Sequence, residues 1–131
     1  MCMYVKNTAK IRRTFKSIPC WKAVEISEDG YMSPYAGNRI IYRVGKTAKM
    51  GIRETLLIYK NGTCCKVESG LHTFCDINAA LTEAAWLGSV TYRKFTVLEC
   101  RIPKFARFVK GIDSRGNNNY VSDRLKVIRI I

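Results

Sequence analysis

The chain has 131 residues, 47% of them hydrophobic, and carries 23 Lys and Arg against 10 Asp and Glu, for a formal net charge of +13. This length and composition suit one domain, residues 1–131, with its own hydrophobic core. No apolar run approaches the roughly 20 residues of a membrane helix, and residues 1–15 lack the apolar core of a signal peptide. We therefore predict a cytoplasmic protein with no membrane partner.

Basic residues are concentrated near both ends of the sequence. Residues 1–16 hold no acidic side chain, and we interpret them as a candidate basic N-terminal arm. The cations of this segment are Lys6, Lys10, Arg12, Arg13 and Lys16. Eight further Lys and Arg lie between Arg101 and Ile131, against only Asp113 and Asp123. This excess favours a polyanionic partner, either nucleic acid or an acidic protein surface, over a charge that only serves solubility.

The first half of the sequence has the pattern of short strands joined by turns. Strands are expected at residues 3–5 and 20–26 (CWKAVEI), and Asp29-Gly30 indicates a hairpin turn after the second of these. Residues 33–38 have loop composition and residues 39–45 (RIIYRVG) are predicted as a strand.

A second hairpin is expected further along. Residues 46–53 are polar and contain Gly, which predicts a loop or an irregular edge. Residues 55–59 (TLLIY) and 63–68 are predicted strands, and Asn61-Gly62 between them is a strong signal for a tight turn.

The stretch from residue 70 to residue 88 predicts the one main helix, over residues 76–87. An apolar stripe repeats at helical spacing, with Asp76 in front of it as N-cap and Gly88 behind it as the residue that ends the helix. The residues of the stripe are Ile77, Ala80, Leu81 and Ala84. Because strand patterns flank the helix on both sides, we expect it to lie on a sheet.

The remaining elements are again strands. Residues 90–102 alternate in period two, with Leu98, Cys100 and Ile102 on one face, and Pro103 should end the strand. Short strands are predicted at residues 105–109 and 125–131, with a mobile polar loop (GIDSRGNNN) at residues 111–119. The predicted fold is α+β, a mostly antiparallel sheet of about five to seven strands with one main helix.

The cysteines leave an enzymatic alternative open. Removal of the first methionine would give Cys2 a free α-amine beside its thiol, the arrangement of an N-terminal nucleophile, and His72 could act as its base. An ordinary terminal cysteine and a structural histidine are the readings we favour. We therefore predict no catalytic residue, with Cys2 and His72 as the alternative.

A second group of cysteines has the side-chain types of a zinc site. The four residues are Cys64, Cys65, His72 and Cys75. Adjacent residues on a strand point to opposite faces, and the paired CxxC spacing is missing. We predict no metal ion and no other cofactor.

Aromatic and basic residues are interleaved in residues 104–110 (KFARFVK). Single-strand binders combine aromatic platforms for bases with cations that follow the phosphates, whereas an edge strand protected by cations would have a similar composition. Nucleic-acid recognition motifs are missing, so any binding should be independent of sequence. The predicted binding residues are Lys6, Lys10, Arg12, Arg13, Lys16, Lys104, Phe105, Arg107, Phe108 and Lys110.

Several short motifs occur in a characteristic order: MCxY at residues 1–4, GLHTF at 70–74 before a helix, CRIPK at 100–104 and SDRL at 122–125. In this order the chain resembles short uncharacterised proteins of Bacteroides-type bacteria and their phages. The resemblance implies an accessory protein of a phage or mobile element in the bacterial host cytoplasm, with interference with host defence as one such role. The chain departs from that group in its basic excess and its Cys64-Cys65 pair.

The leading hypothesis is therefore a noncatalytic binding module that engages nucleic acid, or a host complex that handles nucleic acid, through residues 6–16 and 104–110. Two alternatives are kept: the N-terminal-cysteine enzyme and a protein-interaction module for an acidic partner. The oligomeric state does not follow from the sequence.

Overall fold

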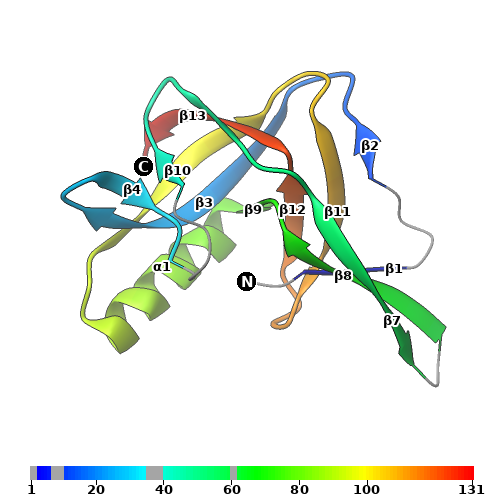
Figure 1. Ribbon diagram of the computed structural model, residues 1–131. Coiled ribbons are helices and arrows are strands. Elements are labelled where there is room, and N and C mark those ends of the chain that lie inside the picture. Colours follow the sequence, from blue (N-terminus) through cyan, green and yellow to red (C-terminus); the bar gives the residue numbers. More distant parts are fainter. Residues whose placement is uncertain (1–2, 7–10, 35–39, 60–61) are drawn as a thin grey trace.

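The computed structural model describes residues 3–6, 11–34, 40–59 and 62–131 (Figure 1). In this part of the chain one helix accompanies a single sheet of thirteen strands, and neighbouring strands run antiparallel. The predicted α+β class with one helix and an antiparallel sheet is confirmed. The predicted strand number is too low. Four strands have only two or three residues and show no periodicity in the sequence, and the strands Leu71–Phe74 and Asn118–Ser122 were not predicted.

The strands form one continuous sheet. In chain order the elements are β1 (Met3–Lys6), β2 (Arg12–Arg13), β3 (Ile18–Ser27), β4 (Gly30–Met32), β5 (Ile41–Tyr42), β6 (Thr47–Lys49), β7 (Arg53–Tyr59), β8 (Gly62–Ser69), β9 (Leu71–Phe74), α1 (Ile77–Thr91), β10 (Phe95–Ile102), β11 (Arg107–Asp113), β12 (Asn118–Ser122) and β13 (Arg124–Ile130). Hydrogen-bonded neighbours follow the order β6-β13-β10-β3-β9-β12-β11-β1-β8-β7. Strand β2 pairs with β11, β4 with β3 and β5, and β5 with β4. Strand β1 thus lies between β8 and β11.

Both predicted hairpins form. Strands β3 and β4 pair Ser27 with Gly30, so the chain reverses at Glu28 and Asp29. Strands β7 and β8 pair Tyr59 with Gly62, and this hairpin extends away from the helix in Figure 1. Strand β10 ends at Ile102, directly before Pro103, as predicted.

Two predicted elements are wrong. Residues 111–119 are not a loop but most of a hairpin, because the Asp113 carboxylate accepts hydrogen bonds of 2.9 Å from the backbone N–H groups of Arg115 and Asn117 and closes a tight turn. The strand predicted at 39–45 is reduced, in the part of it that the structure describes, to the two residues of β5.

The helix begins where the sequence predicts and ends later. Asp76 is its N-cap and accepts a hydrogen bond of 3.3 Å from the Asn78 N–H. The helix continues past Gly88 to Thr91, whose hydroxyl donates to the carbonyl of Leu87 (2.6 Å). Tyr92, with φ 58°, then takes the left-handed capping conformation that we expected of Gly88.

The helix lies against one face of β3, β10 and β9 (Figure 1), which confirms that a sheet supports it. Its buried face contains Ala80, Glu83 and Leu87, whereas Leu81 of the predicted stripe is exposed. Two residues of the predicted stripe do face the sheet, since Ala80 packs into a small cluster with Phe74 of β9 and Val97 of β10 and Ala84 lies partly buried against it.

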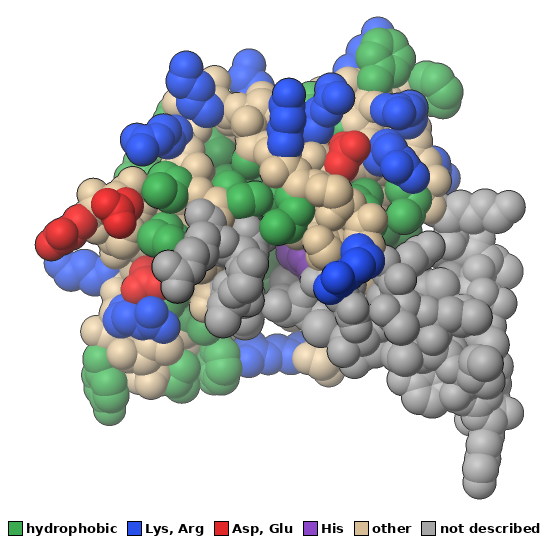
Figure 2. Space-filling model, in the orientation of Figure 1, with side chains coloured by type: hydrophobic (Ala, Val, Ile, Leu, Met, Phe, Trp, Pro, Cys, Tyr) green, Lys and Arg blue, Asp and Glu red, His purple; other side chains and the backbone are tan. Residues whose placement is uncertain are grey.

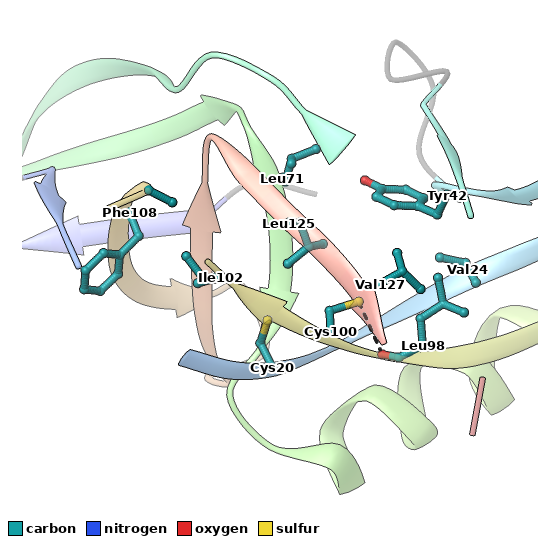
Figure 3. Packing of buried hydrophobic residues seen from close by; sticks show 11 residues of the cluster. Cys20, Val24, Tyr42, Leu71, Leu98, Cys100, Ile102, Phe108, Leu125 and Val127 are labelled. Atoms are coloured by element: carbon teal, nitrogen blue, oxygen red, sulfur yellow. Dashed lines mark hydrogen bonds between the residues drawn. The ribbon is translucent and has the colours of Figure 1, made fainter. Parts of the chain in front are cut away.

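The main hydrophobic core lies on the opposite face of β3 and β10. The predicted alternation of β10 is confirmed, since Leu98, Cys100 and Ile102 are fully buried in this core while Val97 faces the helix. Figure 3 shows the packing, with Phe108 at one end of the cluster and Tyr42 at the other. The core therefore connects directly to β11, the strand that carries the second basic segment.

Candidate nucleic-acid interface

The two basic segments of the sequence meet in the fold. Strand β2 pairs antiparallel with β11, which sets Arg13 opposite Arg107 and Arg12 opposite Phe108. In Figure 1, β2 lies on the outer side of β11, and the chain then crosses over the top of the sheet into β3. Residues 11–16 are thus attached to the sheet beside residues 104–110.

A clamp at Thr14 fixes the turn that follows β2. The Thr14 N–H donates to the carbonyl of Ala106 (3.0 Å), and the Phe105 N–H donates to the carbonyl of Thr14 (2.7 Å). The Arg13 guanidinium donates to the carbonyl of Phe105 (2.9 Å). Phe105 has φ 71°, a strained conformation for an aromatic residue, which these hydrogen bonds hold in place.

A groove with a cavity volume of about 690 Å³ lies between residues 12–19 and the surface of β11 and β12. Its cations are Arg12, Arg13, Lys16 and Lys110, and its aromatic side chains are Phe15, Phe108 and Tyr120. We call this feature the β2–β11 groove. A concave, partly apolar surface with several cations suits a ligand that combines flat rings with negative charge.

The aromatic rings in and beside the groove differ in whether another side chain contacts them. The Arg12 guanidinium lies 5.2 Å from the centroid of Phe108, and Tyr120 meets Phe108 edge to face at 6.1 Å. Lys104 lies over Phe105 at 5.0 Å. Phe15, at 82% exposure, has no ring contact among the described residues. One aromatic face of the groove is therefore open to solvent.

Tyr120 keeps its proton at neutral pH. Burial, helped by the neighbouring Cys75, raises the pKa of Tyr120 to about 12. The groove thus presents a neutral hydroxyl and its cations, a combination that favours an anionic ligand.

The structure brings together five of the predicted binding residues in the groove. They are Arg12, Arg13, Lys16, Phe108 and Lys110. Lys104, Phe105 and Arg107 lie beside the groove without lining it. The backbone of Lys6 belongs to β1, its side chain is not described, and Lys10 lies outside the described residues.

Six lining residues were not among the predicted binding residues: Thr14, Phe15, Ser17, Ile18, Pro19 and Tyr120. Phe15 stands between Thr14 and Lys16, so an aromatic residue inside a basic segment was a signal available for it. Tyr120 carried no local signal, because only the pairing of β11 with β12 places it opposite Lys110.

A second basic surface lies on the outer side of β6, β13 and β10. Lys49 is directly opposite Arg124, and Lys126 is directly opposite Arg101, all four exposed. We call these four residues the basic ladder. The Arg101 guanidinium donates to the Ser17 hydroxyl (3.3 Å), which connects the ladder to the groove. Figure 2 shows Lys and Arg side chains gathered over this upper part of the molecule.

Like charges directly opposite on a sheet destabilise it. We therefore expect Lys49→Glu, which sets a carboxylate against Arg124, to raise Tm by roughly 2–4 °C, and Lys49→Gln to give about half of that rise. Thermal melts at low salt measure both. A lower Tm for Lys49→Glu would show that the two side chains do not repel each other in the fold.

The alternative catalytic residues lie apart from the groove as far as the structure describes them. Cys2 is outside the described residues. His72, on β9, contacts the Gly70 carbonyl through Nδ1 (3.2 Å), and its Nε2 is buried with no partner among the described residues. Burial, together with the ammonium of Lys22, lowers the pKa of His72 to about 4, so the ring is neutral at pH 7.

Of the three cysteines whose side chains the structure describes, Cys20 and Cys100 are core residues and Cys75 is half-buried. Cys20 and Cys100 are fully buried and face each other across β3 and β10, and burial raises the pKa of both thiols, that of Cys20 to about 12. Among the described residues, no three His, Cys, Asp or Glu side chains are grouped as a metal site would need. The side chains of Cys64 and Cys65, which belong to the predicted zinc ligands, lie outside the description.

No protein-family model, curated protein or solved structure matches the chain. Within the described residues, no helix has the length and apolar character required to cross a membrane.

Proposed function

We propose that the protein is a noncatalytic nucleic-acid-binding module and that the β2–β11 groove is its binding site. The observation that carries the proposal is the pairing of β2 with β11, which joins two basic segments from distant parts of the sequence around one aromatic groove.

The charge on this surface suits a phosphate backbone. The groove contains four cations, and the basic ladder continues the positive surface through Arg101 and Ser17. A chain of phosphates supplies regularly spaced anions, and each one neutralised releases counterions, which favours binding. Binding of a polyanion would also explain why the ladder places like charges opposite each other, since a bound anion would remove their repulsion.

The proposed setting is a phage or mobile element acting in the cytoplasm of a bacterial host, with interference with host defence as the role. It rests on the resemblance through the MCxY, GLHTF, CRIPK and SDRL motifs. The nucleic acid in that setting is either free or held by a host complex. The surface of such a complex would present the same phosphates to the groove.

Fluorescence anisotropy tests the proposal directly. Labelled single- and double-stranded DNA and RNA are titrated with protein stripped of nucleic acid, at two salt concentrations. We expect binding at low salt that weakens steeply as salt rises. Failure to bind any of these probes at low salt would reject the proposal.

The two alternatives lead to different results in the same tests. A module for an acidic protein partner would bind a labelled poly-glutamate peptide and not the oligonucleotides. The N-terminal-cysteine enzyme requires loss of Met1, which intact-mass analysis reports, and a retained Met1 removes the free amine that its mechanism needs.

A further inference from the structure

We propose that the ligand of the β2–β11 groove is a single strand and that one of its unpaired bases stacks on Phe15. This inference rests on the proposed nucleic-acid function and adds the class of nucleic acid and the side chain that distinguishes it. A double helix keeps its bases stacked on each other and offers only their edges and the backbone to a protein.

The exposure of Phe15 is the first observation. Phe15 is 82% exposed, although it stands beside a groove whose other phenylalanine, Phe108, is 6% exposed. The fold does not need this side chain for its core. The Thr14 clamp fixes the chain on the N-terminal side of Phe15, and the Lys16 N–H bonds to the Thr14 hydroxyl (3.3 Å) on the other. A large apolar ring is thus held outward by an ordered backbone.

The occupation of the neighbouring rings is the second observation. Arg12 lies over Phe108, Tyr120 meets Phe108 at an interplanar angle of 69°, and Lys104 lies over Phe105. These rings already have partners, whereas Phe15 has none among the described residues. A base could therefore stack on Phe15 without displacing an internal contact, which is how single-strand binders use aromatic side chains.

The cations around Phe15 are the third observation. Arg12, Arg13 and Lys16 are its neighbours in sequence, and Lys110 lies on the opposite wall of the same groove. A base on Phe15 would have its flanking phosphates within a positively charged surface on both sides. The cavity of about 690 Å³ lies within the 300–1,000 Å³ typical of small-ligand sites, so one nucleotide has room to enter.

The test uses three labelled probes that differ in one property each. The first is an oligothymidylate of about 12 nucleotides, the second an abasic strand with the same number of phosphates, and the third a hairpin duplex. The variants are Phe15→Ala and, as a matched control, Tyr92→Asn, which removes a 94% exposed aromatic ring at the end of α1 and keeps a residue that accepts the left-handed conformation.

We expect Phe15→Ala to lower affinity for the oligothymidylate about tenfold and to change affinity for the abasic strand by less than about twofold. Tyr92→Asn should change neither. Wild-type protein should bind the oligothymidylate more tightly than the duplex. Thermal melts check that both variants fold, which the exposure of both side chains favours.

Different results separate the two proposals. If wild-type protein binds none of the probes, the nucleic-acid function itself fails. If it binds the duplex as tightly as the single strand, or if Phe15→Ala weakens the abasic and normal strands equally, the protein still binds nucleic acid but the stacking inference is wrong. Tighter binding of a poly-glutamate peptide than of any strand would assign the groove to an acidic protein instead.

Discussion

Replacing Arg12, Lys16 and Lys110 together with alanine should lower the affinity for single-stranded nucleic acid about 100-fold at 0.1 M salt. The three cations line the β2–β11 groove from two segments of the chain. Each phosphate contact to a single strand contributes about 0.7 to the slope of log affinity against log salt, so three lost contacts remove about 2 from that slope. Anisotropy titrations over a range of salt concentrations measure both quantities.

Arg13 is left in place in this triple variant because its guanidinium bonds to the Phe105 carbonyl and supports the local fold. The matched control replaces Arg43, Lys46 and Lys94, three exposed cations outside the groove, and lowers the net charge by the same amount. The control should keep most of the affinity. Equal losses in the two triple variants would mean that the protein attracts nucleic acid through its net charge and has no preferred site.

Lys22→Met should stabilise the protein at pH 7, by about 2 kcal/mol. Lys22 is 6% exposed in the main core, where its Nζ donates to the His72 carbonyl (2.7 Å) and lies 5.4 Å from the centre of the Tyr42 ring. Burial lowers its pKa from 10.5 to about 8. Keeping Lys22 charged in the folded protein with a pKa lowered by this much costs at most roughly 3 kcal/mol of folding free energy. The single hydrogen bond to His72 offsets about 1 kcal/mol of that cost.

The same shift has a defined pH dependence. Between pH 8 and 10.5 the unfolded chain holds a proton on Lys22 that the folded protein has released, so this residue makes stability rise with pH in that window. Urea melts of wild type and Lys22→Met across pH 7–10.5 isolate the effect, because the buried thiols and Tyr42 titrate in both proteins. The advantage of the variant should shrink as pH rises.

Lys94→Met is the control for these melts, since Lys94 is exposed and its replacement should leave the pH dependence of wild type intact. A constant difference between wild type and Lys22→Met at all pH values would show that Lys22 is protonated to the same extent in the folded and unfolded states. The buried location of the charge would then have no energetic consequence.

Local patterns in the sequence were sufficient for part of this fold. Asp29-Gly30 and Asn61-Gly62 each predicted a hairpin that forms, and the period-two strand predicted over residues 90–102 is confirmed from Phe95 to Ile102 in β10. Asp76 was identified as an N-cap because a carboxylate before an apolar helical stripe has few other roles. In each case the residues that determine the structure are neighbours in sequence.

The sequence predicted which kinds of residue form the groove but not that they meet on one surface. The cations of residues 12–16 and 107–110 were identified, but the pairing of β2 with β11 depends on contacts between distant segments that leave no local pattern. Asp113 shows the opposite difficulty, because its polar surroundings resemble a loop until its carboxylate is seen to accept two backbone N–H groups. Phe15 had one local signal, its place inside a basic segment, although its residue type alone is equally typical of a core position.

The position of β1 between β8 and β11 has a consequence for how the protein is made. Met3 pairs with Val67 on one side and with Asp113 on the other, so this early segment has no complete set of partners until most of the chain has left the ribosome. Strand β1 can pair with β8 once β8 has emerged, but its other edge stays open until β11 follows, and open edges attract other chains. Because the groove also requires β11, the nascent chain should acquire its nucleic-acid site late, in the same step that closes this edge.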